Sequence, residues 1–304
     1  MSLRGKTLVR KGYNQMKHKY WKILMMSVAG AGLMTLMQLP AQAAELSTLD
    51  GYGREQAADA NYKATHGSAA FPLENTDPEY AAIMKKYIYG DIAEQVKITP
   101  VERSLITLAV LTTNQNERLL ANAVEEALAV KATPLQIRES IYHVTPYIGF
   151  AKTTAAVEIM DGVFKKHGIK LPLEKQGTTT DENRFERGLD FQVRTYGESI
   201  TKMRASVPAY QKHLQDDLSA FCFGDIYTRG TLDLKMREML TVAAIGSLGI
   251  EAQFRSHVNG TLAAGATPEE VIGVITTMNP YVGFPRTLWM MKIANECFAA
   301  RQVQ

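Results

Sequence analysis

The stretch PYVGFP, from Pro280 to Pro285, closely repeats the stretch PYIGFA, from Pro146 to Ala151. Proline is disfavoured inside a helix and glycine eases a bend, so each stretch predicts a corner between two helices. The two corners lie 134 residues apart. That spacing indicates that the chain contains the same structural unit twice.

The same offset of 134 residues brings other segments into register. The segment 90–92 (GDI) falls on 224–226, and the segment 132–134 (ATP) falls on 266–268. Chance similarity between apolar helices does not explain matched turn tripeptides in register. A period of this length is typical of duplicated domains rather than of a short-repeat solenoid.

Farther upstream, the segment 54–67 (REQAADANYKATHG) resembles the segment 184–197 (RFERGLDFQVRTYG) at an offset of 130. An insertion or deletion of a few residues accounts for the change of offset. We therefore predict a first copy at 44–167, a polar linker at 168–182 and a second copy at 183–304.

Both copies are predicted to be helical. Runs of β-branched residues are short, and no alternating apolar stretch is bounded by hairpin turns. The segment 267–270 (TPEE) is typical of a helix start, because it offers an N-cap hydroxyl, a first-turn proline and two carboxylates near the positive end of the helix dipole. The segment 133–134 opens the same helix in the first copy. The predicted fold class is all-α, with two tandem units that form a pseudo-dimer.

The charge of the chain is concentrated at its start. Residues 1–43 contain seven Lys and Arg side chains and no acidic one, and removing them would change the formal net charge from +3 to −4. A mildly acidic body gives no electrostatic reason to expect nucleic-acid binding.

The basic start precedes an uncharged stretch at 23–36, a proline and the triplet AQA at 41–43. This order is typical of a cleaved secretory signal, in a chain that starts at Met1 or Met16. An uncleaved anchor and a core helix are the alternatives.

The segment 237–260 (REMLTVAAIGSLGIEAQFRSHVNG) predicts two helices around a glycine-containing turn near Leu248. Glu238 lies ten residues before the turn and His257 nine after it, so each stands about 15 Å from the turn along its helix. In an antiparallel pair the two side chains would be level, and the carboxylate could orient the imidazole for proton transfer. A surface glutamate and a separate histidine are the alternative from spacing alone.

This segment, followed by GATPEEVIGVI and PYVGFPR, resembles the carboxymuconolactone decarboxylase family. The shared pattern is a helix with a glutamate, a short turn, a helix with S-H-V-x-G, a T-x-E-E helix start and Y-x-G-F-P. The resemblance covers nearly all of 184–299 and is weaker over 54–165. It implies an all-α fold related to the alkylhydroperoxidase D proteins and a homo-oligomeric ring, here a trimer of two-unit chains.

Two departures from the superfamily pattern bear on the chemistry. In its peroxidase branch a C-x-x-C motif precedes the histidine, but the corresponding positions here hold Ile250 and Gln253. Without a dithiol, this segment cannot run the thiol–disulfide cycle that reduces peroxides. The residues 134 positions before the glutamate and the histidine are Ser104 and Ala123. The first copy is therefore expected to be a scaffold, with one active site per chain.

Two other residues of the second copy are candidates for substrate binding. Arg286, like Lys152 in the first copy, follows the Y-x-G-F corner, where a cation makes sense if a substrate carboxylate or a neighbouring subunit lies nearby. Tyr281 could hydrogen-bond a substrate, although its first-copy counterpart Tyr147 makes packing the alternative role. His143 has no partner visible in the sequence.

Cys222 and Cys297 are the two cysteines of the chain, and both lie in the second copy. In an oxidising compartment they could form a disulfide, and two separately buried thiols are the alternative. No cluster of histidine, cysteine and carboxylate residues has the spacing of a metal site, so neither a metal nor another cofactor is predicted.

The resemblance implies cofactor-free decarboxylation or proton transfer on a small carboxylated lactone or related acid. His257 would handle the proton, Glu238 would orient it, and Arg286 would hold the substrate carboxylate. The alternatives are a peroxidase-like antioxidant protein, which the missing C-x-x-C disfavours, and a non-catalytic binding or assembly protein. The export signal would place the mature chain in the periplasm, with no membrane or nucleic-acid partner.

We expect the mature chain to begin near Ala44, because the AQA triplet at 41–43 is a small-residue cleavage site. Mass spectrometry of the N-terminal peptide of the exported protein measures the cleavage position. Soluble cytoplasmic protein that keeps Met1 or Met16 as its first residue would contradict the prediction.

Overall fold

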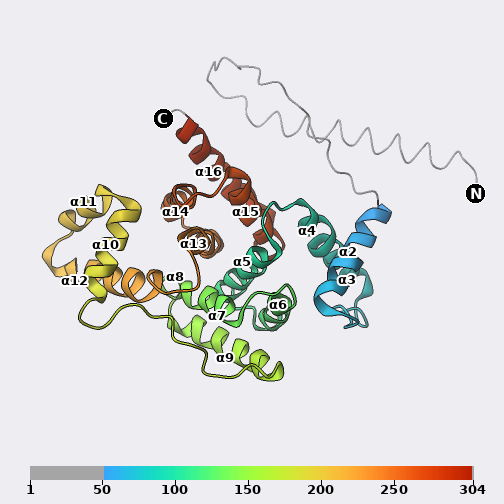
Figure 1. The fold of residues 1–304 in the computed structure, drawn as a ribbon. Coiled ribbons are helices and arrows are strands. Elements are labelled where there is room, and N and C mark those ends of the chain that lie inside the picture. The colour runs from blue at the N-terminus through green and yellow to red at the C-terminus, as the bar shows by residue number, and fades with distance from the viewer. Residues whose placement is uncertain (1–50, 303–304) are drawn as a thin grey trace, which may run out of the picture. The chain divides into compact units, whose positions relative to one another are not determined.

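The computed structural model describes residues 51–302, and in that range every regular element is a helix (Figure 1). The predicted export signal at 1–43 lies outside the described residues. None of the helices in the described part of the chain has the length and apolar character that crossing a bilayer requires.

The first copy consists of α2 (Gly51–His66), α3 (Pro78–Lys85), the π-helix η1 (Lys86–Ile92), α4 (Ala93–Gln95), α5 (Pro100–Thr113), α6 (Glu117–Ala129), α7 (Pro134–His143), α8 (Thr145–Ile148) and α9 (Phe150–Lys166). The second copy consists of α10 (Arg184–Tyr196), α11 (Glu198–Ser206), the short 3₁₀-helix η2 (Ala209–Gln211), α12 (Lys212–Asp217), the π-helix η3 (Leu218–Tyr227), α13 (Leu234–Leu248), α14 (Glu251–Ala263), α15 (Pro268–Val282) and α16 (Phe284–Gln302).

Corresponding helices begin where the sequence offset places them. Helices α5 and α13 start at Pro100 and Leu234, and helices α9 and α16 start at Phe150 and Phe284, 134 residues apart in both cases. The π-helices η1 and η3 also occupy equivalent places. The prediction of an all-α chain with two tandem units is confirmed.

The Thr-Pro dipeptides explain three of the helix starts. In α5, α7 and α15 the threonine hydroxyl accepts a hydrogen bond from the third helical residue, whose side chain bonds back to the threonine N–H. Such capping boxes satisfy two backbone donors that a helix start leaves open. The threonines are Thr99, Thr133 and Thr267, and their partners are Glu102, Gln136 and Glu270.

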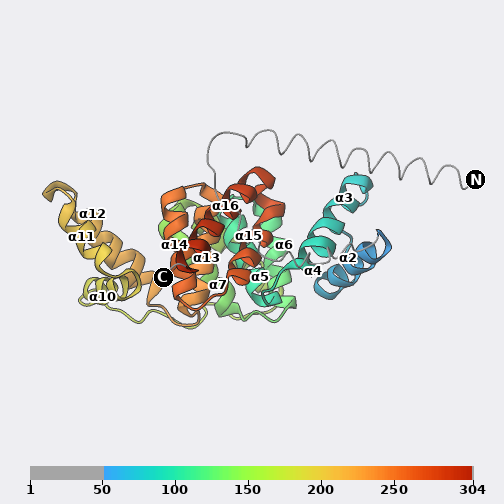
Figure 2. The ribbon, with the colours of Figure 1, turned by 90° about the horizontal axis from the view of Figure 1, so that it is seen from above.

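Helices α5 and α13 form the centre of the described unit, where they pack against each other (Figures 1 and 2). Every residue of α5 from Ser104 to Thr113 is buried, and so is every residue of α13 from Met236 to Gly246. The copies also interlock, because α7 of the first copy packs against α13 and α15 of the second copy packs against α5. Each copy therefore supplies part of the wall around the central helix of the other.

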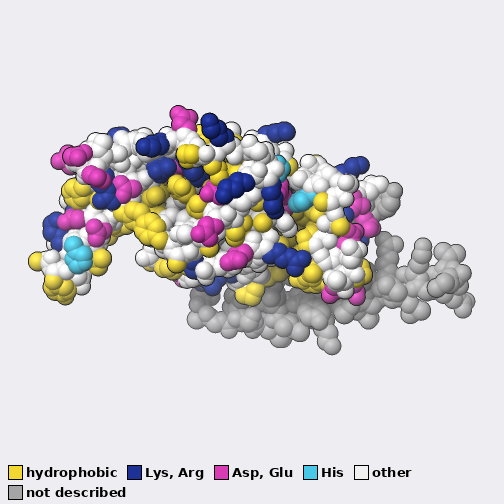
Figure 3. All heavy atoms as spheres, turned by 90° about the horizontal axis from the view of Figure 1, so that it is seen from below, with side chains coloured by type: hydrophobic (Ala, Val, Ile, Leu, Met, Phe, Trp, Pro, Cys, Tyr) yellow, Lys and Arg dark blue, Asp and Glu magenta, His cyan; other side chains and the backbone are white. Residues whose placement is uncertain are grey.

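The surface view in Figure 3 shows lysine and arginine side chains interspersed with aspartate and glutamate. A polyanion such as nucleic acid is attracted by a continuous positive surface. On that face the positive and negative side chains are mixed and form no such surface.

The Y-x-G-F corner of the second copy differs from the sequence prediction in one respect. Helix α15 continues through Pro280 and ends at Val282, so the bend lies at Gly283 rather than at the proline. Gly283 and Gly149 have φ values of 76° and 83°, in the left-handed region that glycine adopts without strain. Glycine therefore makes the corner in both copies.

Helix α10 meets η3 at a crossing that only glycine fits. A Cβ atom added to Gly188 would lie 2.5 Å from the backbone nitrogen of Gly224. The first copy has Ala58 at the position that corresponds to Gly188, so its crossing between α2 and η1 is less tight. The two backbones of the second copy are thus in direct contact, and this contact fixes the positions of α10 and η3.

We expect Gly188→Ala to lower the free energy of unfolding by about 1–3 kcal/mol, because the added methyl group overpacks α10 against η3. Gly162 of α9 is the control, since a Cβ at that exposed helical position meets nothing within 4 Å. Gly162→Ala should raise the free energy of unfolding by roughly 0.5–1 kcal/mol. Urea unfolding followed by circular dichroism measures both, and equal stability of the two variants would contradict the close approach.

Candidate active site

Glu238 and His257 lie side by side on the adjacent helices α13 and α14. The His257 Nδ1 atom lies 2.8 Å from Glu238 Oε2. The Glu238 side chain is fully buried, whereas the His257 side chain keeps 12% of its surface exposed. The turn between the helices begins at Gly249, which has the left-handed conformation typical of a helix end. The structure thus brings together the two residues that the spacing predicts to be level.

Two tyrosine hydroxyls complete the surroundings of the Glu238 carboxylate. Tyr196 of α10 donates to Oε1 at 2.7 Å, and Tyr227 of η3 donates to the same oxygen at 3.0 Å. Together with His257 they give three donors to a carboxylate whose burial would otherwise be unfavourable. Burial and the Glu238 charge raise the pKa values of Tyr196 and Tyr227, so both hydroxyls keep the protons that they donate.

The hydrogen bonds assign the tautomer of His257. An ionised carboxylate only accepts, so the His257 Nδ1–H donates to Glu238. In the neutral imidazole the free nitrogen is then Nε2, which can take up or deliver a proton. The pair therefore has the geometry of a carboxylate-oriented general acid–base.

Gly260, one helical turn after His257 on α14, leaves the space that the carboxylate occupies. A Cβ atom at this position would lie 2.5 Å from Glu238 Oε2 and 3.5 Å from the Tyr196 ring. Any other residue would displace the carboxylate from its three donors. This accounts for the glycine of the S-H-V-x-G pattern.

The first copy contributes Tyr147 to this site. Its hydroxyl lies 2.8 Å from the Tyr227 hydroxyl, and its ring stands edge-on to the His257 ring with 5.9 Å between centroids. Thr241 Oγ1 lies 2.9 Å from the Tyr227 hydroxyl and 3.2 Å from that of Tyr147. A residue of the copy that lacks Glu238 and His257 therefore forms part of their surroundings.

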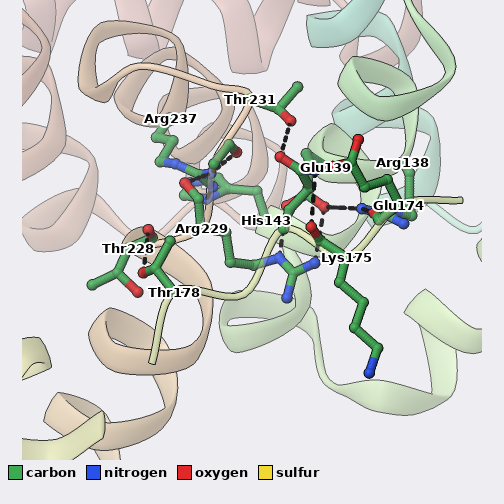
Figure 4. A network of polar contacts seen from close by, with 12 residues as sticks. Arg138, Glu139, His143, Glu174, Lys175, Thr178, Thr228, Arg229, Thr231 and Arg237 are labelled. Atoms are coloured by element: carbon green, nitrogen blue, oxygen red, sulfur yellow. Dashed lines mark hydrogen bonds and ion pairs between the residues drawn. The ribbon is translucent and has the colours of Figure 1, made fainter. Parts of the chain in front are cut away.

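A buried chain of polar groups continues from Thr241 to His143 of α7. His143 Nε2 lies 2.9 Å from Thr241 Oγ1. His143 Nδ1 accepts from Arg237 at 3.3 Å, and Figure 4 shows these two side chains. Because a guanidinium only donates, the proton of His143 is on Nε2. Burial, followed by the Arg237 charge, holds the pKa of His143 well below its ordinary value. Burial also lowers the pKa of Arg237 to about 10.

The sequence alone gave no partner for His143, because its partners belong to the other copy. A second link between the copies lies beside it (Figure 4). Arg229 of the second copy donates to Glu139 of the first at 2.7 Å, and Arg138 donates to the same carboxylate at 2.9 Å. Glu139 is fully buried, so both arginines neutralise a charge that has no access to water.

Arg286 does not lie at the Glu238–His257 pair. Its guanidinium covers Gly249, where an added Cβ would lie 2.5 Å from the Arg286 Cζ atom. That position is the carboxyl end of α13, and its counterpart Lys152 donates to the Thr113 carbonyl at the carboxyl end of α5 at 3.0 Å. Cations at these places stabilise a helix end. The structure thus places Arg286 at this helix end, and its role in substrate binding stays a prediction.

Tyr281 is also placed elsewhere. It lines cavities of the first copy with Glu126 and Thr107, and burial raises its pKa. The interlocking of α15 with α5 carries it there, just as α8 carries Tyr147 to the second copy. The sequence offset does not show that each corner tyrosine lies beside the central helix of the other copy.

The two cysteines are free and buried in separate clusters. Burial raises the pKa of Cys222 to about 12, so this thiol has little thiolate character. Cys297 lies near Asn259 of α14 at 3.7 Å. Among the side chains described from 53 to 301, no group of three or more histidine, cysteine, aspartate and glutamate residues could hold a metal ion.

Two cavities border the site. The larger, of about 750 Å³, is lined by Tyr196, Gly260 and Arg301 among other residues. Tyr196 and Gly260 contact the acid–base pair directly, so a single layer of residues separates this cavity from the Glu238 carboxylate. The other, of about 320 Å³, is lined by Tyr227 and the arginines around it.

We expect His143 to make the folded state less stable in acid. Its folded pKa is lowered, so below the ordinary value of 6.5 the unfolded chain takes up a proton that the folded chain refuses. Each pH unit below that value should remove about 1.4 kcal/mol from the free energy of unfolding. His143→Gln should remove this part of the loss between pH 7.5 and 5.5, as measured by urea unfolding.

The exposed His213 provides the control for this measurement. His213→Gln should leave the pH dependence of unfolding as it is in the wild type. If His143→Gln and His213→Gln show the same pH dependence, the buried neutral state assigned to His143 is wrong.

Comparison with known proteins finds the same family on both copies of the chain. The sequence profile of the Carboxymuconolactone decarboxylase family matches residues 78–162 and 212–296, together more than half of the chain. The 4-carboxymuconolactone decarboxylase of Acinetobacter baylyi is 27% identical over 119 residues, which cover 39% of this chain and 89% of that protein. An uncharacterised 15.0 kDa protein of Paracoccus denitrificans, from the nqo9–nqo10 intergenic region, is 33% identical over 103 residues, or 33% of this chain and 72% of that protein.

The chain also resembles the solved structure of a proposed gamma-carboxymuconolactone decarboxylase subunit from Burkholderia xenovorans LB400. The TM-score is 0.48 and the sequence identity is 20%, and the match covers 81% of this chain and 98% of that one. The profile matches fall one on each copy of the repeat. The chain therefore belongs to the carboxymuconolactone decarboxylase family.

Proposed function

We propose that the second copy catalyses cofactor-free decarboxylation, or a related proton transfer, on a small carboxylated lactone or similar acid. The observation that carries the proposal is the His257 imidazole, which the buried Glu238 carboxylate holds at 2.8 Å with Nε2 left free. The relative from Acinetobacter baylyi, named 4-carboxymuconolactone decarboxylase, supports the choice of substrate class.

In the proposed reaction the bond between the substrate carboxyl carbon and the lactone breaks, and CO₂ leaves. The electron pair of that bond stays on the conjugated lactone, which must then gain one proton. Protonated His257 delivers this proton from Nε2 and afterwards takes another from solvent. The Glu238 carboxylate fixes the ring and stabilises the imidazolium before the transfer.

Arg301 replaces Arg286 as the candidate cation for the substrate carboxylate. It lines the cavity of about 750 Å³ together with Tyr196 and Gly260. Its guanidinium donates to the Asn259 carbonyl at 3.3 Å, which leaves most of its donors for a ligand. The substrate would thus lie between α10 and α14, against Ser256 and Gly260 of the helix that carries His257.

A peroxidase of the same superfamily is the second candidate, and the arrangement of the thiols disfavours it. Ile250 and Gln253 stand in place of the dithiol, and Cys222 and Cys297 lie in separate clusters. A non-catalytic binding or assembly protein is the other candidate. Export of the chain and its assembly as a trimer of two-unit chains remain predictions from the sequence.

We expect His257→Ala and Glu238→Gln each to lower turnover of 4-carboxymuconolactone by about 10²-fold or more, the usual scale for loss of a general acid–base group. Release of CO₂ and loss of lactone absorbance measure turnover. Arg301→Gln should instead raise KM, because it removes a group that binds the substrate without taking part in proton transfer.

Two exposed residues of the second copy are matched controls, and His213→Ala and Glu186→Gln should leave turnover unchanged. Circular dichroism must show that each variant is folded, since a buried Glu238 without its partner could destabilise the helices. A folded His257→Ala variant with wild-type turnover would refute the proposed role. Wild-type protein that turns over none of a panel of γ-carboxylated lactones would favour the binding or assembly protein.

A further inference from the structure

The first copy contains two adjoining cavities at the place that corresponds to the Glu238–His257 site. One is lined by Arg103, Glu126 and Tyr281, and the other shares Glu126 and Tyr281 and adds His66. Each offers about 40 Å³ to the centres of water molecules. One water needs about 10–15 Å³ by this measure, so the two cavities together have room for several waters.

Glu126 and His66 form an acid–base pair at these cavities. His66 Nε2 lies 3.3 Å from Glu126 Oε1, and the Tyr89 hydroxyl donates to the same oxygen. The His66 and Glu126 side chains keep 12% and 25% of their surfaces exposed. The His66 ring also stacks on Tyr62, with 4.2 Å between centroids. A carboxylate, an imidazole and a phenol therefore meet here, as they do at Glu238.

These groups come from other sequence positions than in the second copy. At the offset of 134, Glu126 corresponds to Gly260, and at the offset of 130, His66 corresponds to Tyr196. The carboxylate is thus on α6, the equivalent of α14, whereas Glu238 is on α13. The imidazole is on α2, the equivalent of α10, whereas His257 is on α14. Comparison of the aligned positions, Ser104 and Ala123, predicts a scaffold without acid–base groups. The carboxylate and the imidazole are nevertheless present, at other positions.

Thr65 orients the His66 ring. An ionised carboxylate only accepts, so the His66 Nε2–H donates to Glu126. His66 Nδ1 is then the acceptor, and the Thr65 hydroxyl donates to it at 2.8 Å. An oriented histidine–carboxylate pair therefore lies at the cavity wall.

Arg103 brings an unpaired positive charge to the same wall. Its counterpart Arg237 donates to the backbone oxygens of Arg229 and Gly230 at 2.8 and 3.0 Å. The Arg103 guanidinium makes no hydrogen bond or ion pair with any residue from 51 to 302. A free guanidinium in a cavity wall is suited to binding a carboxylate through two parallel hydrogen bonds.

The charges of the wall define the ligand. Arg103 attracts a carboxylate, whereas Glu126 accepts hydrogen bonds and repels a second anion. A ligand that satisfies both has a carboxylate at one end and a hydroxyl at the other. The space for several waters limits it to about five non-hydrogen atoms. The Tyr281 hydroxyl, which comes from the second copy, lies close enough to Arg103 and Glu126 to be affected by both charges.

We propose that the first copy is a second ligand site, which binds a small hydroxycarboxylic acid with its carboxylate on Arg103 and its hydroxyl on the Glu126–His66 pair. Each chain then has two sites for small acids, built from the same kinds of group at different positions. This site does not depend on the chemistry proposed for the second copy.

Isothermal titration of the folded full chain with glycolate and with propionate tests the proposal. The two anions have the same number of non-hydrogen atoms, and propionate carries a methyl group where glycolate carries the hydroxyl. Glycolate should bind with a Kd of about 1–10 mM, the range expected for so small a ligand. Propionate should bind about 10-fold more weakly, because its methyl group cannot donate a hydrogen bond to Glu126 as the glycolate hydroxyl does.

Substitutions locate the binding. Arg103→Gln should weaken glycolate binding about 10-fold or more, and because Arg103 has no partner among the described residues, this change breaks no internal bond. Arg118→Gln removes the same charge from an exposed position of the first copy and should leave the Kd unchanged. Glu126→Gln should abolish most of the preference for glycolate over propionate.

His257→Ala separates this proposal from the function of the second copy. It should leave glycolate binding unchanged while it lowers lactone turnover. The proposal is overturned if Arg103→Gln binds glycolate as the wild type does, or if His257→Ala abolishes the binding. Wild-type protein that binds no glycolate at about 50 mM, well above the expected Kd, would also overturn it.

Discussion

The fully buried Glu238 carboxylate is the constraint on which the second copy depends. A charge without access to water is tolerated only when hydrogen-bond donors replace the water, and here the donors are Tyr196, Tyr227 and His257. They come from α10, η3 and α14, so the three elements must all approach α13 closely. The glycine contact between α10 and η3 and the absence of a side chain at Gly260 permit that approach.

Interlocking of the copies explains why the chain needs the Y-x-G-F corner twice. Each corner carries a tyrosine to the central helix of the opposite copy, Tyr147 toward α13 and Tyr281 toward α5. A single copy would lack this tyrosine and, in the second copy, the contact between His143 and Thr241. The buried ion pair between Glu139 and Arg229 adds a link across the same boundary. Two copies in one chain therefore form one packed body, and neither site is complete within its own repeat.

The periodicity of the sequence predicted what depends on neighbours along the chain. The all-α class, the capped helix starts and the level placement of Glu238 and His257 all follow from local rules of helix geometry and capping. Tyr281 was harder to place, because its surroundings belong to the other copy. The offset between copies shows that two residues are equivalent, but it does not show which copy supplies their neighbours. His66 was not among the predicted residues, because a functional group need not stay at its aligned position. The match between 54–67 and 184–197 aligns it with Tyr196.

Steric coupling accounts for the different positions of the acid–base groups in the two copies. A glutamate on the central helix, as at Glu238, requires a glycine on the next helix, because a Cβ at Gly260 would lie 2.5 Å from its carboxylate. The first copy has Ser104 on its central helix, and the shorter side chain leaves room for Glu126 at the position of that glycine. The second copy thus combines a central-helix glutamate with a glycine, and the first copy combines a central-helix serine with a glutamate. Glutamates at both positions do not fit together. A copy that changed from one to the other through a glutamate at both positions would crowd two carboxylates into one buried site, where like charges repel strongly. A copy with glutamates at both positions is therefore expected to be less stable than either copy as it stands.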